Sequence, residues 1–189
     1  MRETKILIAG SGGQGVVLAG NILARACVSE GKNVAGMVSY GAEVRGGTAN
    51  ATLIISQDEI VCPFVVRPDV AIILNQPSLD RFEEDILPGG LALLNTSMVS
   101  RPMKRRDLEV IEIAATELAR QLGNIKAANM AALGAFVAGT GILEQKSVEQ
   151  SIRDLFASKN PKMVELNLRA FESGLENGRS VRAGGKQKD

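Results

Sequence analysis

Two glycine-rich segments hold the residues of this 189-residue chain whose types and spacing could do chemistry. The first is Gly10-Ser11-Gly12-Gly13-Gln14-Gly15, which follows the apolar run 6–9 and opens onto an apolar run with helical spacing. A strand that turns through glycines into a helix exposes backbone N–H groups at the positive end of the helix, where a phosphate can sit. We therefore predict that the chain begins as a phosphate- or nucleotide-binding unit.

The second segment is Ser39-Tyr40-Gly41-Ala42-Glu43-Val44-Arg45-Gly46-Gly47, which places the chain's single tyrosine, a glutamate and an arginine among three glycines. Glycines permit tight turns and close backbone approach, and the planar guanidinium of Arg45 suits a carboxylate or a phosphate. The same residues also fit a turn in which Glu43 and Arg45 are solvated or paired with each other. The residues alone leave both interpretations open.

The first segment matches the glycine spacing of dinucleotide-binding proteins, but the rest of that pattern is missing. Such proteins carry an acidic residue about 20 positions later, at the end of the second strand, to hold the ribose hydroxyls. Here Glu30 falls too early and Glu43 too late, and the predicted strand ends at Ser39 and Tyr40. NAD binding is therefore disfavoured, whereas binding of a phosphate group is not. No Lys-Ser/Thr pair follows the glycines, so the Walker pattern is absent as well.

The composition excludes several kinds of chemistry within this chain. There is no histidine, and two cysteines are fewer than the four or so thiolates that hold an iron–sulfur cluster. Cys27 and Cys62 both lie in apolar sequence, so we expect both to be small buried residues. We assign no catalytic residue and no metal ligand.

The charge and hydropathy of the chain limit its partners. A net charge of +1 and 3% aromatic residues give no reason to expect nucleic acid or an acidic membrane surface as a partner. No apolar run reaches the roughly 18 residues of a membrane span. We therefore expect a cytoplasmic protein that contacts neither nucleic acid nor membrane.

Alternating apolar runs and helical patterns predict a three-layer α/β fold, Rossmann-like, with a mostly parallel sheet flanked by helices. The runs 33–39 and 48–56 lie so close that we expect them to pair antiparallel. Ligands of such sheets bind beyond the carboxyl ends of the strands, where both glycine segments would lie. We expect one domain over 1–177 and a flexible basic tail over 178–189. The other expected strands are 5–9, 69–74, 91–95 and 110–114, and the expected helices are 15–30, 79–86, 116–122, 129–138, 147–156 and 162–177.

Two further features have plain structural interpretations. A basic cluster is predicted to be a solvated loop, since charge runs usually are; it consists of Arg101, Lys104, Arg105 and Arg106. Asn129 could cap a helix near the ligand crevice, although capping a buried helix would explain it equally well.

Taken in order, these motifs resemble the gamma subunit of 2-oxoacid:ferredoxin oxidoreductases over roughly residues 5–140. Within that family, the form of Ser39–Gly47 is most similar to the 2-oxoglutarate branch; related indolepyruvate enzymes tend to carry a histidine near the tyrosine, and this chain has none. Besides the two glycine segments, the resemblance rests on Asn75-Gln-Pro-Ser-Leu79 with Phe82, Pro88-Gly-Gly90 with Asn95, and Ala128-Asn-Met130 with Leu133-Gly134.

The resemblance implies an enzyme that works as a complex, with this chain inactive alone. In the family, a 2-oxoacid is oxidatively decarboxylated to an acyl-coenzyme A while ferredoxin is reduced. Alpha and beta subunits hold thiamine diphosphate with magnesium, and iron–sulfur clusters lie on the beta or a small delta subunit. The glycine segments would then shape the coenzyme A side of the active site. Arg45 would hold a phosphate or an acidic partner group, and Glu43 would orient Arg45.

Several alternatives remain open at this point. The substrate could be pyruvate or a branched-chain 2-oxoacid instead of 2-oxoglutarate. The glycine segments could contact only a partner subunit, so that the chain merely scaffolds a complex, and the isolated chain could form a homodimer through that surface. A stand-alone Rossmann-type oxidoreductase that uses NAD(P) or flavin is the remaining alternative, against which the missing ribose acid and the missing histidine argue.

Overall fold

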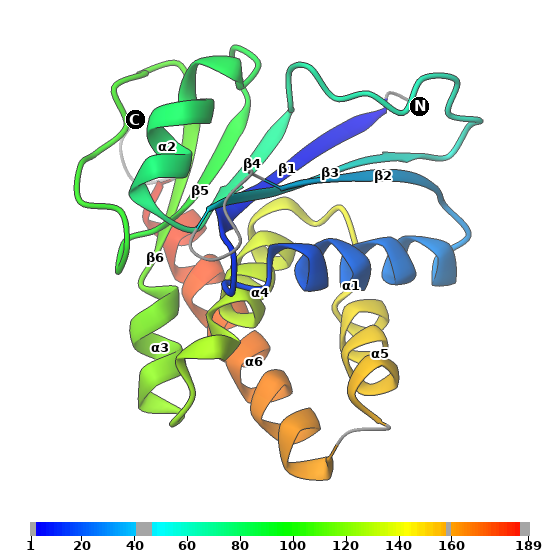
Figure 1. The fold of residues 1–189 in the computed structure, drawn as a ribbon, viewed down its shortest axis with the longest axis vertical. Coiled ribbons are helices and arrows are strands. Elements are labelled where there is room, and N and C mark those ends of the chain that lie inside the picture. Colours follow the sequence, from blue (N-terminus) through cyan, green and yellow to red (C-terminus); the bar gives the residue numbers. More distant parts are fainter. Residues whose placement is uncertain (1–2, 41–46, 158–159, 186–189) are drawn as a thin grey trace.

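A computed structural model describes residues 3–40, 47–157 and 160–185 of the chain (Figure 1). In this described part, six strands form one sheet with the order β2-β3-β1-β4-β5-β6. Four of them run parallel to one another: β1 (Thr4–Ser11), β4 (Val70–Ile73), β5 (Leu91–Asn95) and β6 (Glu109–Ile113). The predicted α/β fold class is confirmed.

The hairpin of β2 (Asn33–Tyr40) and β3 (Thr48–Ser56) supplies the antiparallel part of the sheet. The expected antiparallel pairing of these two strands is confirmed, and β3 also pairs antiparallel with β1. Its register sets Ser11 opposite Thr48 and Tyr40 opposite Ala49. The hairpin therefore ends beside the carboxyl end of β1, where the first glycine segment begins.

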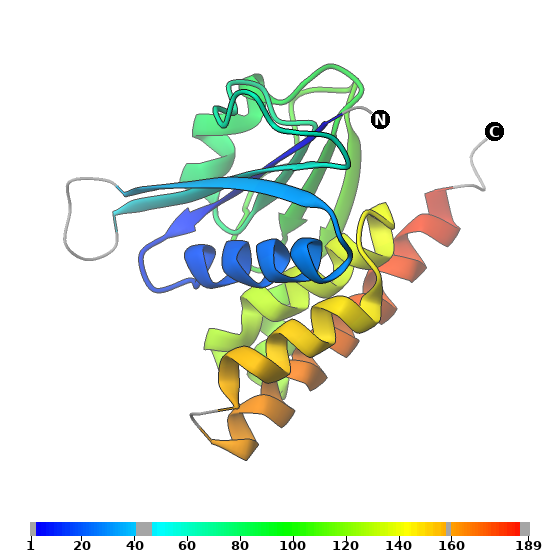
Figure 2. The same cartoon turned by 90° about the vertical axis from the view of Figure 1, so that its right-hand side faces the viewer.

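The helices cover the two faces of the sheet unequally (Figures 1 and 2). On one face lies α2 (Gln76–Phe82), continued by the short 3-10 helix η1 (Glu83–Asp85). None of the helices in the described residues is long and apolar enough to cross a membrane. The opposite face is covered by α1 (Val16–Ser29), α3 (Ala115–Gln121), the 3-10 helix η2 (Ile125–Ala127), α4 (Ala128–Thr140), α5 (Gln145–Phe156) and α6 (Pro161–Gly185).

The central strands are apolar along their whole length because both of their faces are buried. In β1, Ile6 and Ile8 point into the larger core under α1 and α4, whereas Leu7 and Ala9 point into the smaller core under α2. All four residues of β4 are buried as well. A parallel strand covered by helices on both sides reads as such a continuous apolar run, which is why 69–74 was recognisable from the sequence.

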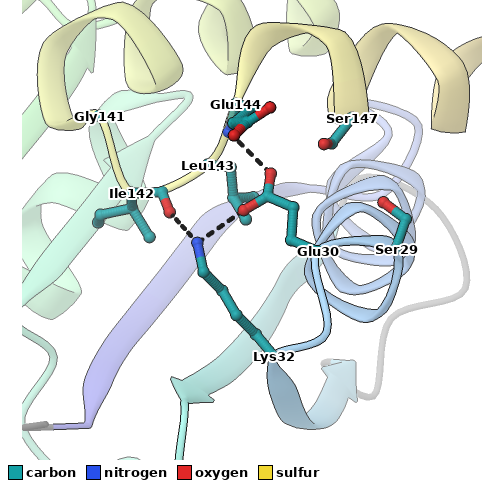
Figure 3. Close-up of a pocket in the computed structure, with 8 residues that line it drawn as sticks. All are labelled: Ser29, Glu30, Lys32, Gly141, Ile142, Leu143, Glu144 and Ser147. Atoms are coloured by element: carbon teal, nitrogen blue, oxygen red, sulfur yellow. Dashed lines mark hydrogen bonds and ion pairs between the residues drawn. The ribbon is translucent and has the colours of Figure 1, made fainter.

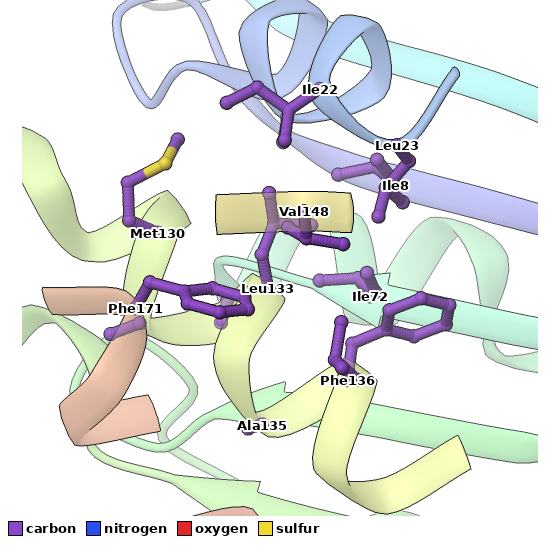
Figure 4. Packing of buried hydrophobic residues seen from close by; sticks show 14 of the residues in the cluster. Ile8, Ile22, Leu23, Ile72, Met130, Leu133, Ala135, Phe136, Val148 and Phe171 are labelled. Atoms are coloured by element: carbon purple, nitrogen blue, oxygen red, sulfur yellow. The ribbon is translucent and has the colours of Figure 1, made fainter. Parts of the chain in front are cut away.

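Helix α4 is the centre of the larger core and has no charged residue. It lies between the sheet and α6, so most of its surface is buried. Figure 4 shows Leu133 of α4 in one cluster with Ile8 of β1, Ile72 of β4 and Phe171 of α6. Full burial of each such large side chain contributes about 1.5–3 kcal/mol, so this cluster is a major source of stability.

Glycines let the backbones of α4 and α6 pack directly against each other. A Cβ atom added at Gly134 of α4 would lie 2.0 Å from the Phe171 carbonyl oxygen, and one at Gly174 would lie 1.9 Å from the Ala131 carbonyl oxygen. Gly178 is packed in the same way, four residues further along α6. Helix α6 continues to Gly185, past the predicted helix end at residue 177, and Gly178, which suggested that end, is instead a packing position against α4.

This contact predicts a specific loss of stability for Gly134→Ala. The added methyl group meets backbone that cannot rotate away, so we expect the free energy of unfolding to fall by about 2–3 kcal/mol in urea denaturation. Gly139→Ala is the matched control in the same helix, because its Cβ would meet the flexible Cδ1 end of Ile111. We expect that control to change stability by less than about 1 kcal/mol. Equal losses for the two variants would contradict the close packing of α4 and α6.

Candidate functional site

The two glycine segments meet at the carboxyl end of β1. The Gly12 N–H donates a hydrogen bond to the Gly47 carbonyl oxygen at 2.9 Å. Strand β2 is antiparallel to β3 and therefore runs in the same direction as β1. It ends with Ser39 and the backbone of Tyr40 at the same edge of the sheet. The structure therefore brings Gly10–Gly15 together with Gly47. The remaining predicted site residues, Gly41, Glu43, Arg45 and Gly46, lie outside the described residues.

The first glycine segment forms a tight turn into α1. The Gln14 N–H donates to the Ser11 carbonyl oxygen at 3.0 Å, which closes the turn. Gly13 and Gly15 have φ angles of +93° and +73°, in the left-handed region that favours glycine. Gly12 and Gly13 are exposed, and a Cβ added at Gly13 would have no atom within 4 Å. The tip of the turn thus faces open space next to the N-terminus of α1.

The side chain of Gln14 does not follow the tip outward. Its Oε1 accepts hydrogen bonds from the Ser11 N–H at 2.7 Å and from Asn75 Nδ2 at 2.8 Å. Its Nε2 donates to the Leu74 carbonyl oxygen at 3.3 Å. The predicted ligand-binding residue Gln14 therefore makes these contacts within the protein.

A buried asparagine lies at the carboxyl end of each of the next two parallel strands, β4 and β5. Asn75, after β4, caps α2 by accepting from the Ser78 N–H at 3.0 Å and donates to Ser11 Oγ at 2.7 Å. Asn95, at the end of β5, donates to the Leu74 carbonyl oxygen at 3.1 Å and to Thr116 Oγ1 at 2.9 Å. From the sequence, both asparagines stood out only as part of the family resemblance. A polar amide directly after an apolar strand is the signal that could have found them.

Asn129 reaches the same turn from α4. Its Nδ2 donates to the Gly15 carbonyl oxygen at 3.1 Å, and its Oδ1 accepts from the Met130 N–H. Helix α4 already begins at Ala128, so Asn129 lies inside the first helical turn and does not occupy the N-cap position. Both predicted roles made Asn129 a helix cap, and that part of the prediction is wrong, whereas its expected place near the glycine turn agrees with the structure.

The described residues at this edge offer hydrogen bonding. Its described polar groups are side-chain amides, hydroxyls and backbone groups. Within the described residues, no group of three or more carboxylates and thiols could hold a metal ion. The arrangement can therefore bind a polar or anionic group at the turn, aided by the positive end of α1.

A polar hollow at the opposite end of α1 has a structural explanation (Figure 3). Lys32 Nζ donates to the Glu30 carboxylate and to the Ile142 carbonyl oxygen, both at 2.6 Å. Glu30 also accepts from the Glu144 N–H at 2.7 Å. These contacts fasten the end of α1 to the α4–α5 connection. The 14 residues of α1 separate this hollow from the glycine turn by about 20 Å.

The prediction of a solvated basic loop is wrong for two of its four residues. Arg101 forms ion pairs with Asp80 at 2.6 Å and Glu83 at 2.8 Å, and Arg105 pairs with Asp107. The acidic partners at 80 and 83 are about 20 residues away in the sequence, so the local charge run did not reveal them. Lys104 and Arg106 are exposed, as predicted.

Glu83 is the buried carboxylate at the centre of this cluster, and no motif in the sequence pointed to it. Its side chain is 3% exposed and forms the ion pair with Arg101. It also accepts hydrogen bonds from the backbone N–H groups of Lys104 and Arg105. Burial alone would raise the pKa of the carboxyl group. The hydrogen bonds from Arg105, Arg101 and Lys104 outweigh burial and hold the pKa below the usual 4.5.

The two cysteines differ in environment. Cys27 is buried in α1, as predicted, and burial raises the pKa of its thiol to about 12. The prediction that Cys62 is buried is wrong, because it is exposed in the segment between β3 and β4. An apolar neighbourhood in the sequence did not imply burial here, since Val61 and Phe64 in the same segment are exposed too.

The fold and the site together define a class: an α/β domain with an inserted hairpin, which presents a braced glycine turn at the carboxyl edge of its sheet. Comparison with known proteins makes the class specific. The chain belongs to the pyruvate ferredoxin/flavodoxin oxidoreductase family, whose model matches residues 5–177.

Two relatives contain this domain in chains of different length. Ketoisovalerate oxidoreductase subunit VorA of Methanothermobacter marburgensis is 39% identical over 176 residues, which cover 93% of this chain and 36% of VorA. The 2-oxoglutarate synthase subunit KorC of Methanocaldococcus jannaschii is 35% identical over 175 residues, which cover 91% of this chain and 92% of KorC. The chain thus spans little more than a third of VorA but nearly all of KorC.

Solved structures agree with the fold. The 2-oxoglutarate:ferredoxin oxidoreductase of Magnetococcus marinus, solved with 2-oxoglutarate, coenzyme A and succinyl-CoA bound, has a TM-score of 0.89 over 96% of this chain and 32% of its own. At 23% identity this likeness shows the fold alone. The gamma subunit of a keto/oxoacid ferredoxin oxidoreductase from Geobacter sulfurreducens has a TM-score of 0.80 and 31% identity over 94% of this chain and 99% of its own.

The contacts of Glu83 predict how stability depends on pH. Because the folded-state pKa is lowered, the carboxylate stabilises the fold above its unfolded pKa, and this contribution is lost as the pH falls through the folded value. We expect Glu83→Gln to lower the free energy of unfolding by about 1–3 kcal/mol near neutral pH and to flatten its decline in acid. Urea denaturation at a series of pH values measures both effects. Exposed Glu84→Gln is the control, and a wild-type-like acid decline in Glu83→Gln would refute the role of Glu83.

Proposed function

We propose that this chain is the gamma subunit of a cytoplasmic 2-oxoacid:ferredoxin oxidoreductase. The complex would oxidatively decarboxylate a 2-oxoacid to an acyl-coenzyme A and reduce ferredoxin. The observation that carries this proposal is the match over nearly full length to KorC and to the Geobacter sulfurreducens gamma subunit. In both, the counterpart of this chain is a subunit by name.

The chemistry of the chain supports a subunit role. Two cysteines and no histidine do not fit an iron–sulfur cluster, and the described residues include no cluster of metal ligands. We therefore assign the clusters, thiamine diphosphate and magnesium to partner subunits, namely alpha, beta and a small delta subunit. Ferredoxin would meet the complex through those partners.

We assign the glycine edge to the coenzyme A side of the active site. Coenzyme A is the reactant that carries phosphates, and the exposed Gly12–Gly13 tip lies beside the positive end of α1. The Gly12–Gly47 hydrogen bond joins this turn to the segment that carries Glu43 and Arg45. The Magnetococcus marinus enzyme of the same fold was solved with coenzyme A bound, which is consistent with this assignment. Arg45 would hold a phosphate or an acidic partner group, and Glu43 would orient it.

The sheet order argues against a stand-alone NAD enzyme. In a dinucleotide-binding unit the second parallel strand lies beside the first, which brings its acidic residue to the glycine turn. Here β3 lies between β1 and β2, so the end of β2 is two strand spacings, about 10 Å, from the end of β1. That end is also formed by Ser39 and Tyr40, which carry no carboxylate.

We propose 2-oxoglutarate as the substrate, on the form of Ser39–Gly47 and the likeness to KorC. A branched-chain 2-oxoacid is the second candidate, favoured by the slightly higher identity to VorA. The complex should be purified through a tag on this chain and assayed for ferredoxin reduction with 2-oxoglutarate, 3-methyl-2-oxobutanoate and pyruvate. We expect thiamine- and cluster-bearing partners and the highest kcat/KM with 2-oxoglutarate. A preference for 3-methyl-2-oxobutanoate would reassign the substrate, and turnover by the isolated chain would overturn the subunit role.

Arg45→Ala tests the coenzyme A assignment in the assembled complex. Loss of a charged hydrogen bond to phosphate should raise the KM for coenzyme A by about tenfold or more, with the KM for the 2-oxoacid unchanged. Arg106→Ala, at an exposed arginine of the basic loop, is the control. An unchanged KM for coenzyme A in an intact complex would contradict the assignment. Loss of assembly would instead identify Ser39–Gly47 as a subunit contact.

A further inference from the structure

The glycine turn is braced from inside the protein by one side-chain amide. Gln14 Oε1 accepts from the Ser11 N–H and from Asn75 Nδ2, and Gln14 Nε2 donates to the Leu74 carbonyl oxygen. Ser11 ends β1, Leu74 follows β4, and Asn75 caps α2. One amide group thus joins the turn to two strand ends and to the start of a helix.

The bracing extends beyond Gln14. The Leu74 carbonyl oxygen also accepts from Asn95 Nδ2, and Asn95 Nδ2 donates in turn to Thr116 in α3. On the other side of the turn, Asn129 of α4 holds the Gly15 carbonyl oxygen. Asn75, Asn95 and Asn129 are each 5% exposed or less, so these bonds are shielded from competition with water.

The glycines of the motif divide into two groups by what surrounds them. Gly10 lies in β1 without a positive φ angle, but a Cβ there would come within 2.8 Å of Gln14 Oε1. At Gly15 a Cβ would come within 2.3 Å of Asn129 Nδ2. These two glycines make room for the bracing amides. Gly12 and Gly13, by contrast, are exposed at the tip.

We propose that Gln14 is a positioning residue rather than a ligand contact. Together with Asn75, it fixes the turn so that Gly12 and Gly13 are the part of the motif that faces a bound group. This inference rests on the proposed function for the identity of that group, coenzyme A. It assigns to Gln14, Gly10 and Gly15 a role inside the protein and restricts direct ligand contact within this motif to its tip.

The test measures two quantities separately in the assembled complex: amide hydrogen exchange in the turn and the KM for coenzyme A. Gln14→Ala removes all three hydrogen bonds, so amide hydrogen exchange over residues 11–15 should become about tenfold faster, the equivalent of one net hydrogen bond. The KM for coenzyme A should rise roughly threefold to tenfold, while kcat and the KM for the 2-oxoacid change less than about twofold. Exposed Gln150→Ala in α5 is the matched control and should change neither quantity.

Gln14→Glu provides a second variant that preserves the size of the side chain. It keeps an oxygen that can accept from Ser11 and Asn75, but its second oxygen would face the Leu74 carbonyl oxygen in place of a donor. We expect its exchange rate over 11–15 to exceed that of wild type. If Gln14→Ala fails to assemble, this variant alone tests the proposal against wild type.

The outcomes separate this inference from the proposed function. Unchanged exchange over 11–15 in both Gln14 variants would overturn the positioning role. A raised KM for coenzyme A with unchanged exchange would also overturn it, because Gln14 would then touch the ligand directly. Faster exchange with an unchanged KM would support positioning of the turn and refute the coenzyme A assignment instead.

Discussion

Buried amide groups at the carboxyl edge of the sheet constrain the rest of this structure. An unsatisfied buried donor or acceptor costs about 1–3 kcal/mol, so the asparagines at the carboxyl ends of β4 and β5 must be placed where partners exist. No side-chain nitrogen or oxygen buried in the described residues lacks a hydrogen-bond partner. The partners come from the glycine turn, α2 and α3, which fixes the positions of these elements relative to one another. A change in any one of them would leave amides of the others unpaired.

Much of the fold could be predicted from the sequence because it is encoded locally. The apolar runs of β1 and β4, the hairpin and the uncharged α4 follow directly from periodicity and composition. The pairing of Arg101 with Glu83 could not be predicted, because the partners are 18 residues apart and meet only through packing. The end of α6 was misplaced for a related reason. Gly178 suggests a helix end until the neighbouring α4, which needs the small size of this residue, is known.

The site could be predicted only in outline. Glycine spacing correctly brought the turn to the carboxyl edge and beside Gly47, but spacing alone does not say why each glycine is needed. Gly10 accommodates an amide oxygen, Gly15 combines a positive φ angle with the close approach of Asn129, and Gly13 has a positive φ angle with open space around it. Only the positions of the surrounding side chains separate these reasons. The amino-acid motif therefore identified a place in the fold, whereas the role of each residue in the motif could be assigned only from the structure.

The inserted hairpin has a consequence for the order in which the sheet assembles. Tyr40 and Ala49 pair across nine positions, whereas Ile6 and Val70 pair across 64. Closing the longer loop costs about 2 kcal/mol more in chain entropy, so the hairpin is entropically the earlier pairing to form. β3 can then offer β1 a ready antiparallel template before the parallel strands arrive. Both neighbours of β1 are long-range partners, since Ser11 pairs with Thr48 across 37 positions, but β3 would meet β1 as part of a preformed hairpin and β4 as a single strand.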